Sequence, residues 1–265
     1  MEIDFLTRLI QHSKFKERSE KTYHTIHLPE LNERLNLNLS LPPLPTSAPE
    51  NDPFAAQPDL QNKNKIEVIY LGNSMLERLK TTGKCTRLAQ FSTSWNAGCG
   101  GDKNANVAHR LSQGMYSVLR KAQEQAEERR TSNCNIKAWV LVSGTNDLRP
   151  KRSFVQSECE SYKVLIDACL RIAPGSRVLA CAMFYRKDIA DEIVDESNGM
   201  LKKVVEKVNE ELVRSGGEEQ VRWVEAPKRL GKEMLVDHVH LNEEGYTVWD
   251  EMLWPLVAEA VGTYS

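Results

Sequence analysis

From residue 66 onward, short apolar runs alternate with longer segments of helical periodicity. We expect strands at four of the runs, which are residues 66–71, 136–142, 177–183 and 221–224. We expect helices between and after them, at 75–79, 104–111, 115–130, 154–173, 189–214 and 242–261. Strands that alternate with helices favour a mostly parallel sheet that helices cover on both faces. The sequence therefore predicts an α/β fold.

The first 62 residues differ in composition from the rest of the chain. Residues 39–60 contain six prolines and show no sustained helical or strand period. We expect an extended arm or linker there, and the sequence assigns no role to residues 1–62. The remaining residues, 63–265, are numerous enough to form one well-buried core.

Charge and hydropathy exclude several classes of protein. The net charge is −2, so no basic field favours nucleic acid as a partner. No stretch approaches the roughly 20 apolar residues that a membrane span needs. The first 20 residues lack the pattern of a secretory signal, which favours a cytoplasmic location. The cysteines are dispersed without a CxxC pair, so we expect free thiols and no zinc ribbon; they are Cys85, Cys99, Cys134, Cys159, Cys169 and Cys181.

A serine stands at the end of the first predicted strand. Ser74 follows the strand at 66–71 and opens a helix. The first N–H groups of a helix have no intrahelical partner and favour negative charge nearby. Ser74 is therefore a candidate nucleophile whose own N–H would stabilise an oxyanion. An ordinary helix cap is the alternative role, because serine is common at that position.

An aspartate and a histidine near the end of the chain could activate this serine. A serine nucleophile needs a base, and the base needs an acceptor that holds its tautomer. Asp237 and His240 are three residues apart, so we expect His240 to face Ser74 with Asp237 behind it. A structural loop is one alternative. A metal site formed by Asp237, His238 and His240 is another, but no second ligand cluster occurs, so we expect no metal and a bystander role for His238.

Two further loops could bind the oxygen of a reacting carbonyl. Gly98-Cys99-Gly100-Gly101-Asp102 lacks the spacing of a P-loop or a dinucleotide site, but Gly101 can present its N–H to a ligand at close range. Asn146 follows the strand at 136–142 and offers an amide donor that needs no deprotonation. A plain turn is the alternative for both loops. We expect packing rather than nucleophilic attack from Cys99, and a turn-stabilising role for Asp147.

In this order the fragments resemble the SGNH hydrolases, also called GDSL-type esterases and lipases. The resemblance extends over about residues 66–261, and the residues that carry it are Ser74, Gly101, Asn146 and His240, with Asp237 three positions before the histidine. Residues 96–102, NAGCGGD, look like the platelet-activating-factor acetylhydrolase subgroup. One position departs from the family pattern: Asn73 stands where the family usually has aspartate.

The resemblance implies both a fold and a reaction. The implied fold is a three-layer α/β/α sandwich of the SGNH or flavodoxin-like type, with residues 63–265 as the hydrolase domain. The implied reaction is hydrolysis of a carboxylic ester without metal or cofactor. Ser74, His240 and Asp237 would form the catalytic triad. The oxyanion would be bound by the N–H groups of Ser74 and Gly101 and by the Asn146 side chain.

The substrate and two other functions stay open. The subgroup resemblance suggests a short acyl group, but a lipid, an acetylated sugar or another small ester would each fit the chemistry. A catalytically silent binding or scaffold protein on the same fold is one alternative function. An acyltransferase that uses the same site is the other. The sequence does not indicate an oligomeric state.

Overall fold

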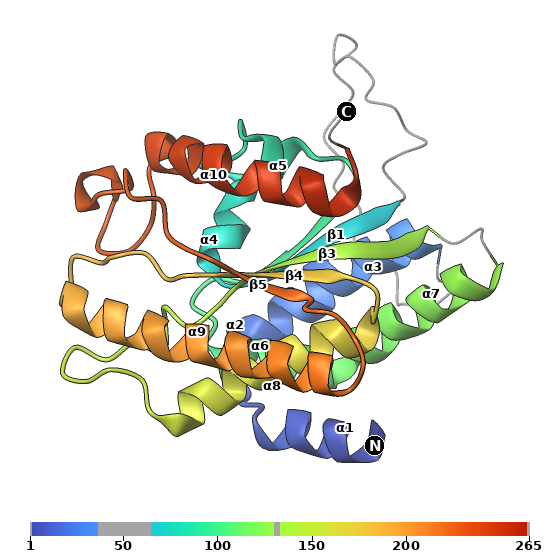
Figure 1. The fold of residues 1–265 in the computed structure, drawn as a ribbon. Coiled ribbons are helices and arrows are strands. Elements are labelled where there is room, and N and C mark those ends of the chain that lie inside the picture. Colours follow the sequence, from blue (N-terminus) through green and yellow to red (C-terminus); the bar gives the residue numbers. More distant parts are fainter. Residues whose placement is uncertain (1, 37–64, 130–132, 264–265) are drawn as a thin grey trace, which may run out of the picture.

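A computed structural model describes residues 2–36, 65–129 and 133–263. Within this part of the chain, five parallel strands form one sheet in the order β2-β1-β3-β4-β5 (Figure 1). The strands are β1 (Ile66–Gly72), β2 (Ser94–Gly98), β3 (Cys134–Val142), β4 (Arg177–Cys181) and β5 (Val221–Val224). This is the flavodoxin-like strand order, in which ligand sites lie where the order reverses, here beside β1 and β3.

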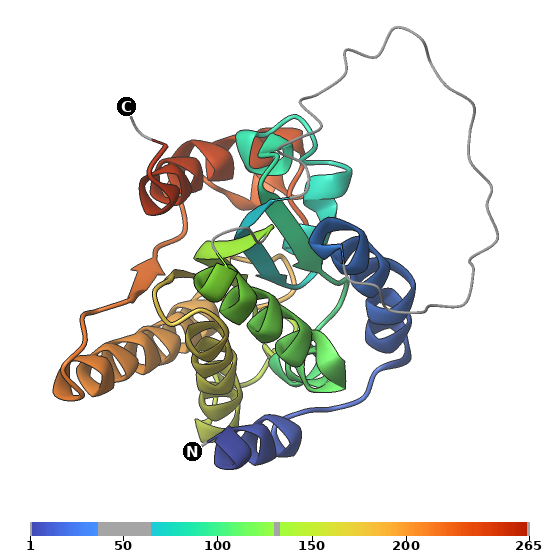
Figure 2. The same ribbon diagram turned by 90° about the vertical axis from the view of Figure 1, so that its right-hand side faces the viewer.

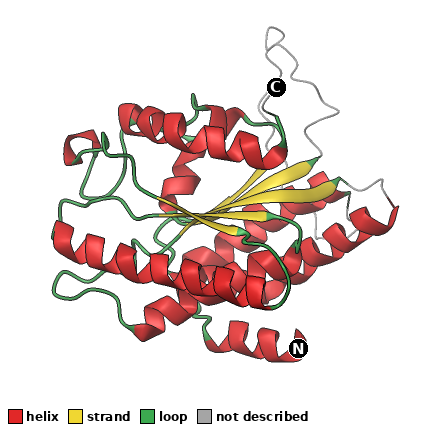
Figure 3. Ribbon diagram, viewed as in Figure 1, coloured by secondary structure: helices red, strands yellow, loops and turns green. Residues whose placement is uncertain are grey.

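Helices cover both faces of the sheet, as the side view in Figure 3 shows. One face carries α4 (Ser74–Glu77), α5 (Arg87–Gln90) and α10 (Glu243–Val261). The opposite face carries α6 (Asn104–Arg110), α7 (Tyr116–Arg129), α8 (Gln156–Ile172) and α9 (Asp191–Arg214). The three-layer α/β/α arrangement is thus confirmed. No helix of the described residues combines the length and the apolar character that crossing a membrane requires.

Short turns of other helical types interrupt or follow these helices. They are the π-helical turns Tyr23–His27 and Leu111–Met115 and the 3-10 turns Arg78–Lys80 and Lys232–Met234. The turn at Leu111–Met115 contains Gly114 at φ 120°, a backbone conformation that residues with a side chain rarely adopt.

The four predicted strands and the six predicted helices are present, with bounds that differ by a few residues. The sequence analysis missed β2, whose sequence Ser94–Gly98 is short and partly polar. In the described structure β2 pairs with β1 alone, at the edge of the sheet, so it does not need the continuous apolar run of a central strand. The inner strand β1, by contrast, is buried along its whole length.

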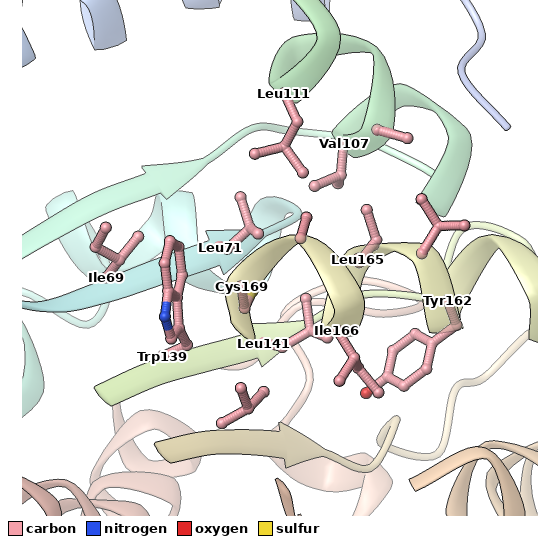
Figure 4. Packing of buried hydrophobic residues seen from close by; sticks show 14 of the residues in the cluster. Ile69, Leu71, Val107, Leu111, Trp139, Leu141, Tyr162, Leu165, Ile166 and Cys169 are labelled. Atoms are coloured by element: carbon pink, nitrogen blue, oxygen red, sulfur yellow. The ribbon is translucent and has the colours of Figure 1, made fainter. Parts of the chain in front are cut away.

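Figure 4 shows why the helix at α8 was predictable from its periodicity. Its residues Tyr162, Leu165, Ile166 and Cys169 are buried on one face of the helix, which covers the sheet beside Leu141 of β3. These positions recur at the spacing of an amphipathic helix. On the neighbouring helix α6, Val107 and the following Leu111 belong to the same buried cluster as Ile69 and Leu71 of β1.

Three helices at the start of the chain pack on the same side as α6. They are α1 (Glu2–Gln11), α2 (Glu17–Thr22) and α3 (Leu28–Leu35), seen in blue in Figure 2. Phe5, Leu9, Tyr23 and Leu31 are fully buried within the main hydrophobic cluster of the molecule. The sequence analysis assigned no structure to these helices. The arm predicted at residues 39–60 lies outside the described residues, and the domain division at residue 62 stays a prediction.

The start of α6 is tied to the loop that follows β3. The N–H of Asn104, the first residue of α6, donates to Asp147 Oδ2 at 3.0 Å. Burial raises the pKa of Asp147 to about 6 from an ordinary value of 3.8, although the bond from Asn104 opposes the rise. The folded protein therefore binds this proton more tightly than the unfolded chain does.

We expect the substitution Asp147→Asn to stabilise the protein at pH 8. The stability that the proton contributes is fully present below about pH 4 and is lost as the pH rises through about 6, a change of about 3 kcal/mol for a shift of two units. Asparagine keeps an acceptor oxygen for Asn104 but cannot ionise. Urea unfolding should show a higher free energy of unfolding for the variant at pH 8 and a smaller difference at pH 5. A difference that does not change with pH would contradict the expectation.

Candidate active site

The turn after β1 presents Ser74 at the first position of α4. Gly72 ends β1 so close to β3 that a Cβ atom there would collide with the carbonyl oxygen of Val142. The next N–H, that of Asn73, donates to the same oxygen at 3.1 Å. Asn73 Oδ1 then accepts from the N–H of Met75 at 3.0 Å and caps the helix. The cap is therefore Asn73, and the Ser74 hydroxyl is available for another partner.

That partner is His240. Ser74 Oγ lies 2.9 Å from His240 Nε2, although the two residues are 166 positions apart in the chain. On the other side of the ring, His240 Nδ1 lies 2.7 Å from Asp237 Oδ2. Ser74 is only 6% exposed, so the contact with the imidazole is largely shielded from water. The structure thus brings together the serine, the histidine and the aspartate that the sequence singled out.

A short closed loop holds Asp237 and His240 in this arrangement. Leu235 and Leu241 form an antiparallel bridge at its base, and the N–H of Val236 donates to the carbonyl of His240 at 2.9 Å. Asp237 Oδ1 accepts from the N–H groups of Val239 and His240, each at 2.8 Å. One carboxylate oxygen is therefore held by the backbone while the other faces the imidazole.

The same contacts keep Asp237 ionised. Burial by itself would raise the pKa of this carboxyl, but the hydrogen bonds from the His240 ring and from the backbone N–H groups of His240 and Val239 outweigh it. They hold the pKa of Asp237 well below its usual range. The guanidinium of Arg78 lies further away, with Nη2 3.8 Å from Asp237 Oδ2.

The glycine loop after β2 lies against the start of α6. Gly101 is exposed and has φ +73°, which favours glycine at this position. The next residue, Asp102, is fully buried, and its carboxylate accepts from Ser19 Oγ of α2 and from Arg110 Nε at 2.9 Å. In the described part of the chain, the N–H of Gly101 donates to no other protein group, and neither does the N–H of Ser74.

Asn146 reaches the glycine loop from the end of β3. Its Nδ2 donates to the carbonyl oxygen of Asp102 at 2.9 Å, which places the amide next to Gly101. An amide nitrogen carries two N–H donors, so one remains after this bond is made. The carbonyl of the preceding residue, Thr145, accepts from Arg186 Nη1 at 2.7 Å. The Asn146 side chain is thus held through its amide, and the backbone just before Asn146 is held through the Thr145 carbonyl.

The sequence analysis missed the buried side chain that joins these loops. Arg110 is fully buried, and besides Asp102 it donates through Nη1 to the carbonyl of Ala97 at 2.8 Å and through Nη2 to that of Gly72 at 3.0 Å. An arginine eight residues after Asp102, near Val107 and Ala108 and directly before Leu111, was the available signal. A buried arginine needs partners of this kind.

The residues that were expected from the sequence to have no catalytic role form no side-chain hydrogen bond with the Ser74–His240–Asp237 arrangement in the described structure. His238 is exposed, and its carbonyl accepts from the N–H of Lys187 at 2.9 Å. Cys99 is fully buried, and burial raises the pKa of its thiol. Among the described residues, no group of three or more histidine, cysteine, aspartate or glutamate side chains is arranged to hold a metal ion. All six cysteines are free thiols, with Cys85 exposed and the others buried.

Several solved structures resemble this fold. A family two carbohydrate esterase from Clostridium thermocellum, in complex with cellohexaose, has a TM-score of 0.50 and 15% identity over 74% of this chain and 65% of that chain. A carbohydrate esterase family 3 structure from Talaromyces cellulolyticus has a TM-score of 0.49 and 15% identity, covering 76% of this chain and 100% of that chain. A lipase/acylhydrolase from Enterococcus faecalis has a TM-score of 0.49 and 13% identity, covering 76% and 97%. At these identities the likeness concerns the fold alone. No curated protein matches the sequence.

The family is shown by the sequence itself. Residues 74–248 match the model of the GDSL-like Lipase/Acylhydrolase family. The matched region is more than half of the chain, and Ser74, Gly101, Asn146, Asp237 and His240 all lie within it. The chain therefore belongs to the GDSL-like lipase/acylhydrolase family and is a carboxylic ester hydrolase.

Proposed function

We propose that this protein is a serine esterase in which Ser74, His240 and Asp237 form the catalytic triad. The observation that carries the proposal is the unbroken chain of contacts from Ser74 Oγ to His240 Nε2 at 2.9 Å and from His240 Nδ1 to Asp237 Oδ2 at 2.7 Å. A hydroxyl, an imidazole and a carboxylate in this order can transfer a proton from the nucleophile to the base.

Asp237 sets the direction of that proton transfer. Its ionised carboxylate accepts a hydrogen bond from His240 Nδ1–H, which leaves the lone pair of Nε2 facing the Ser74 hydroxyl. The backbone bonds to Asp237 Oδ1 prevent the carboxylate from rotating away. The imidazolium that forms when Nε2 takes the serine proton is then stabilised by the adjacent negative charge.

The reaction proceeds in two halves. Ser74 Oγ bonds to the ester carbonyl carbon as His240 Nε2 takes the hydroxyl proton, and the carbonyl oxygen becomes negative. The C–O bond to the alcohol then breaks, and His240 returns the proton to the leaving oxygen. In the second half, water loses a proton to His240 as its oxygen bonds to the acyl carbon. The bond from that carbon to Ser74 Oγ then breaks, His240 returns the proton to Oγ, and the acid leaves.

We assign stabilisation of the oxyanion to Ser74, Gly101 and Asn146. The N–H groups of Ser74 and Gly101 are without protein acceptors in the described structure, and Asn146 keeps one amide N–H after bonding to Asp102. Donors that are already oriented can stabilise charge as it develops without reorganising. The departure at position 73 does not disturb this arrangement, because the Asn73 side-chain oxygen accepts from Met75 as an aspartate oxygen could.

A short acyl group is the substrate feature that the structure favours. A small cavity is lined by Asn73 and Met75, the two neighbours of Ser74, together with Thr145, Met183 and Phe184 among others. Its volume is about 10 Å³, which is close to the least that holds one water molecule. A methyl group is of similar size, so we propose acetyl esters as the preferred class. The alcohol part of the ester and the cytoplasmic location stay predictions.

We expect Ser74→Ala to reduce hydrolysis of p-nitrophenyl acetate by at least about 10⁴-fold, because no other group can take the place of the nucleophile. A fluorophosphonate probe should label the wild-type protein and not the variant. Ser112→Ala, which removes a hydroxyl bonded only to the carbonyl of His109, is the matched control and should keep full activity.

The same measurements separate the alternative functions. A wild-type protein that neither hydrolyses the ester nor reacts with the probe would be a silent binding protein, contrary to the proposal. A wild-type protein that gives mainly the new ester when an alcohol acceptor is added would be an acyltransferase.

The substitution Asn146→Ala should lower kcat by about 10²- to 10³-fold, the usual effect of losing one oxyanion donor. KM should change much less, because the donor acts mainly in the transition state. Asn135→Ala removes an exposed asparagine of β3, the strand that precedes Asn146, and serves as the control. Equal kcat values for the two variants would remove Asn146 from the oxyanion site.

A series of p-nitrophenyl esters tests the acyl preference. We expect kcat/KM to fall from acetate to butyrate to hexanoate, by about tenfold or more per step, because each added pair of methylene groups exceeds the available volume. A rate that stays constant or rises with chain length would refute the assignment of the small cavity to the acyl group and leave the triad unaffected.

A further inference from the structure

Basic side chains from the N-terminal segment lie close to Gly100 and Gly101 of the loop after β2. A Cβ atom on Gly101 would lie 2.8 Å from Lys16 Nζ, and a Cβ atom on Gly100 would collide with the guanidinium of Arg18. Lys16 and Arg18 therefore rest directly on the backbone of the loop. The glycines at these positions leave room for the N-terminal segment as well as for a substrate.

Lys16 makes two polar contacts with this loop. Its ammonium donates to the carbonyl oxygen of Gly100 at 3.2 Å and lies 3.8 Å from Asp102 Oδ1. The side chain is 33% exposed, so both contacts are partly shielded from water. Gly101, whose N–H belongs to the proposed oxyanion site, lies between the two residues that Lys16 contacts.

The backbone on both sides of Lys16 is held in place. The N–H of Lys14 donates to the carbonyl of Ala105 at 2.8 Å, and Asn106 Nδ2 donates to the carbonyl of Lys14 at 2.8 Å. Three residues after Lys16, the hydroxyl of Ser19 bonds to Asp102. The segment is thus fixed to α6 before Lys16 and to the glycine loop after it, so the position of the ammonium group is set by the fold.

The carboxylate of Asp102 faces two positively charged side chains. Asp102 already faces the guanidinium of Arg110 at 2.9 Å, and Lys16 adds a second positive charge to the same carboxylate. The nearby pair of Arg18 and Glu77 is neutral as a unit. Two positive charges thus contact one carboxylate beside the loop where the proposed reaction develops a negative oxygen.

We propose that Lys16 is a positioning residue for the oxyanion site. It fixes the carbonyl of Gly100, and with it the direction of the Gly101 N–H, and it keeps a positive charge beside that donor. The inference rests on the proposed function. Lys16 lies outside residues 74–248, so this part of the site is supplied by a segment that the family match does not include.

The test compares Lys16→Gln with Lys14→Gln in the full-length chain. Both changes remove one positive charge, but the Lys14 side chain is exposed and bonds through its backbone only. We expect Lys16→Gln to lower kcat for p-nitrophenyl acetate by about ten- to a hundredfold, with KM changed less than about twofold. Lys14→Gln should retain the wild-type kcat. Lys16→Arg, which keeps the charge and a donor, should recover most of the loss.

The concentration of active enzyme is taken from fluorophosphonate labelling of Ser74 carried to completion, and each rate is divided by that concentration. Unfolded protein therefore does not lower the measured kcat. A kcat for Lys16→Gln equal to that for Lys14→Gln would overturn the proposal, and so would a change confined to KM. A kcat for Lys16→Arg as low as that for Lys16→Gln would also count against it. Activity that survives in Ser74→Ala would instead reject the proposed function, so the two failures are distinguishable.

Discussion

The guanidinium of Arg110 is fully buried and donates to Asp102, to the carbonyl of Ala97 and to that of Gly72. Transfer of a charged group from water costs several kcal/mol unless its donors are satisfied. Here the partners come from the ends of β1 and β2 and from the glycine loop, so the arginine is satisfied only when all three are in place. The loss of one partner of such a buried pair typically costs about 3–5 kcal/mol.

The two halves of the site are held by different means. On the side of the proposed oxyanion donors, Asp102 bonds through its carboxylate to Arg110 and Ser19 and through its carbonyl to Asn146, so this half depends on contacts between distant segments. The loop with Asp237 and His240 is held mainly by bonds within itself. Ser74 belongs to both halves, because its hydroxyl contacts His240 and its N–H is one of the proposed oxyanion donors. Its helix begins where the end of β1 lies against β3.

The parts of the fold that were predictable are those in which a local pattern determines the structure. Strand β1 is buried along its length and β3 over residues 138–142, so both are mainly apolar there, and the buried face of α8 repeats at helical spacing. Strand β2 escaped prediction because an edge strand of five residues needs no such pattern. Ser74, Asn146 and His240 could be singled out because their chemistry is distinctive and they follow predicted strands or precede a helix.

Other contacts could not be predicted from the local sequence. Arg110, Ser19 and Lys16 take their roles from tertiary contacts with the loop around Asp102. A basic or polar residue in a helical segment usually reads as a solvated position, and only the packed structure distinguishes a buried arginine from an exposed one. The capping function of Asn73 was equally ambiguous, because Asn73 and Ser74 are both common caps.

The packing of α1–α3 has a consequence for how the enzyme could be shortened. Leu31 is buried in the same cluster as Trp95 of β2, whose indole donates to Glu30, and Arg34 donates to the carbonyl of Ser92 beside that strand. A chain without residues 2–36 would expose one flank of β2 to water and would leave Asp102 without Ser19. A fragment that keeps every contact of the loop around Asp102 therefore has to include residues that precede the segment by which the family is recognised.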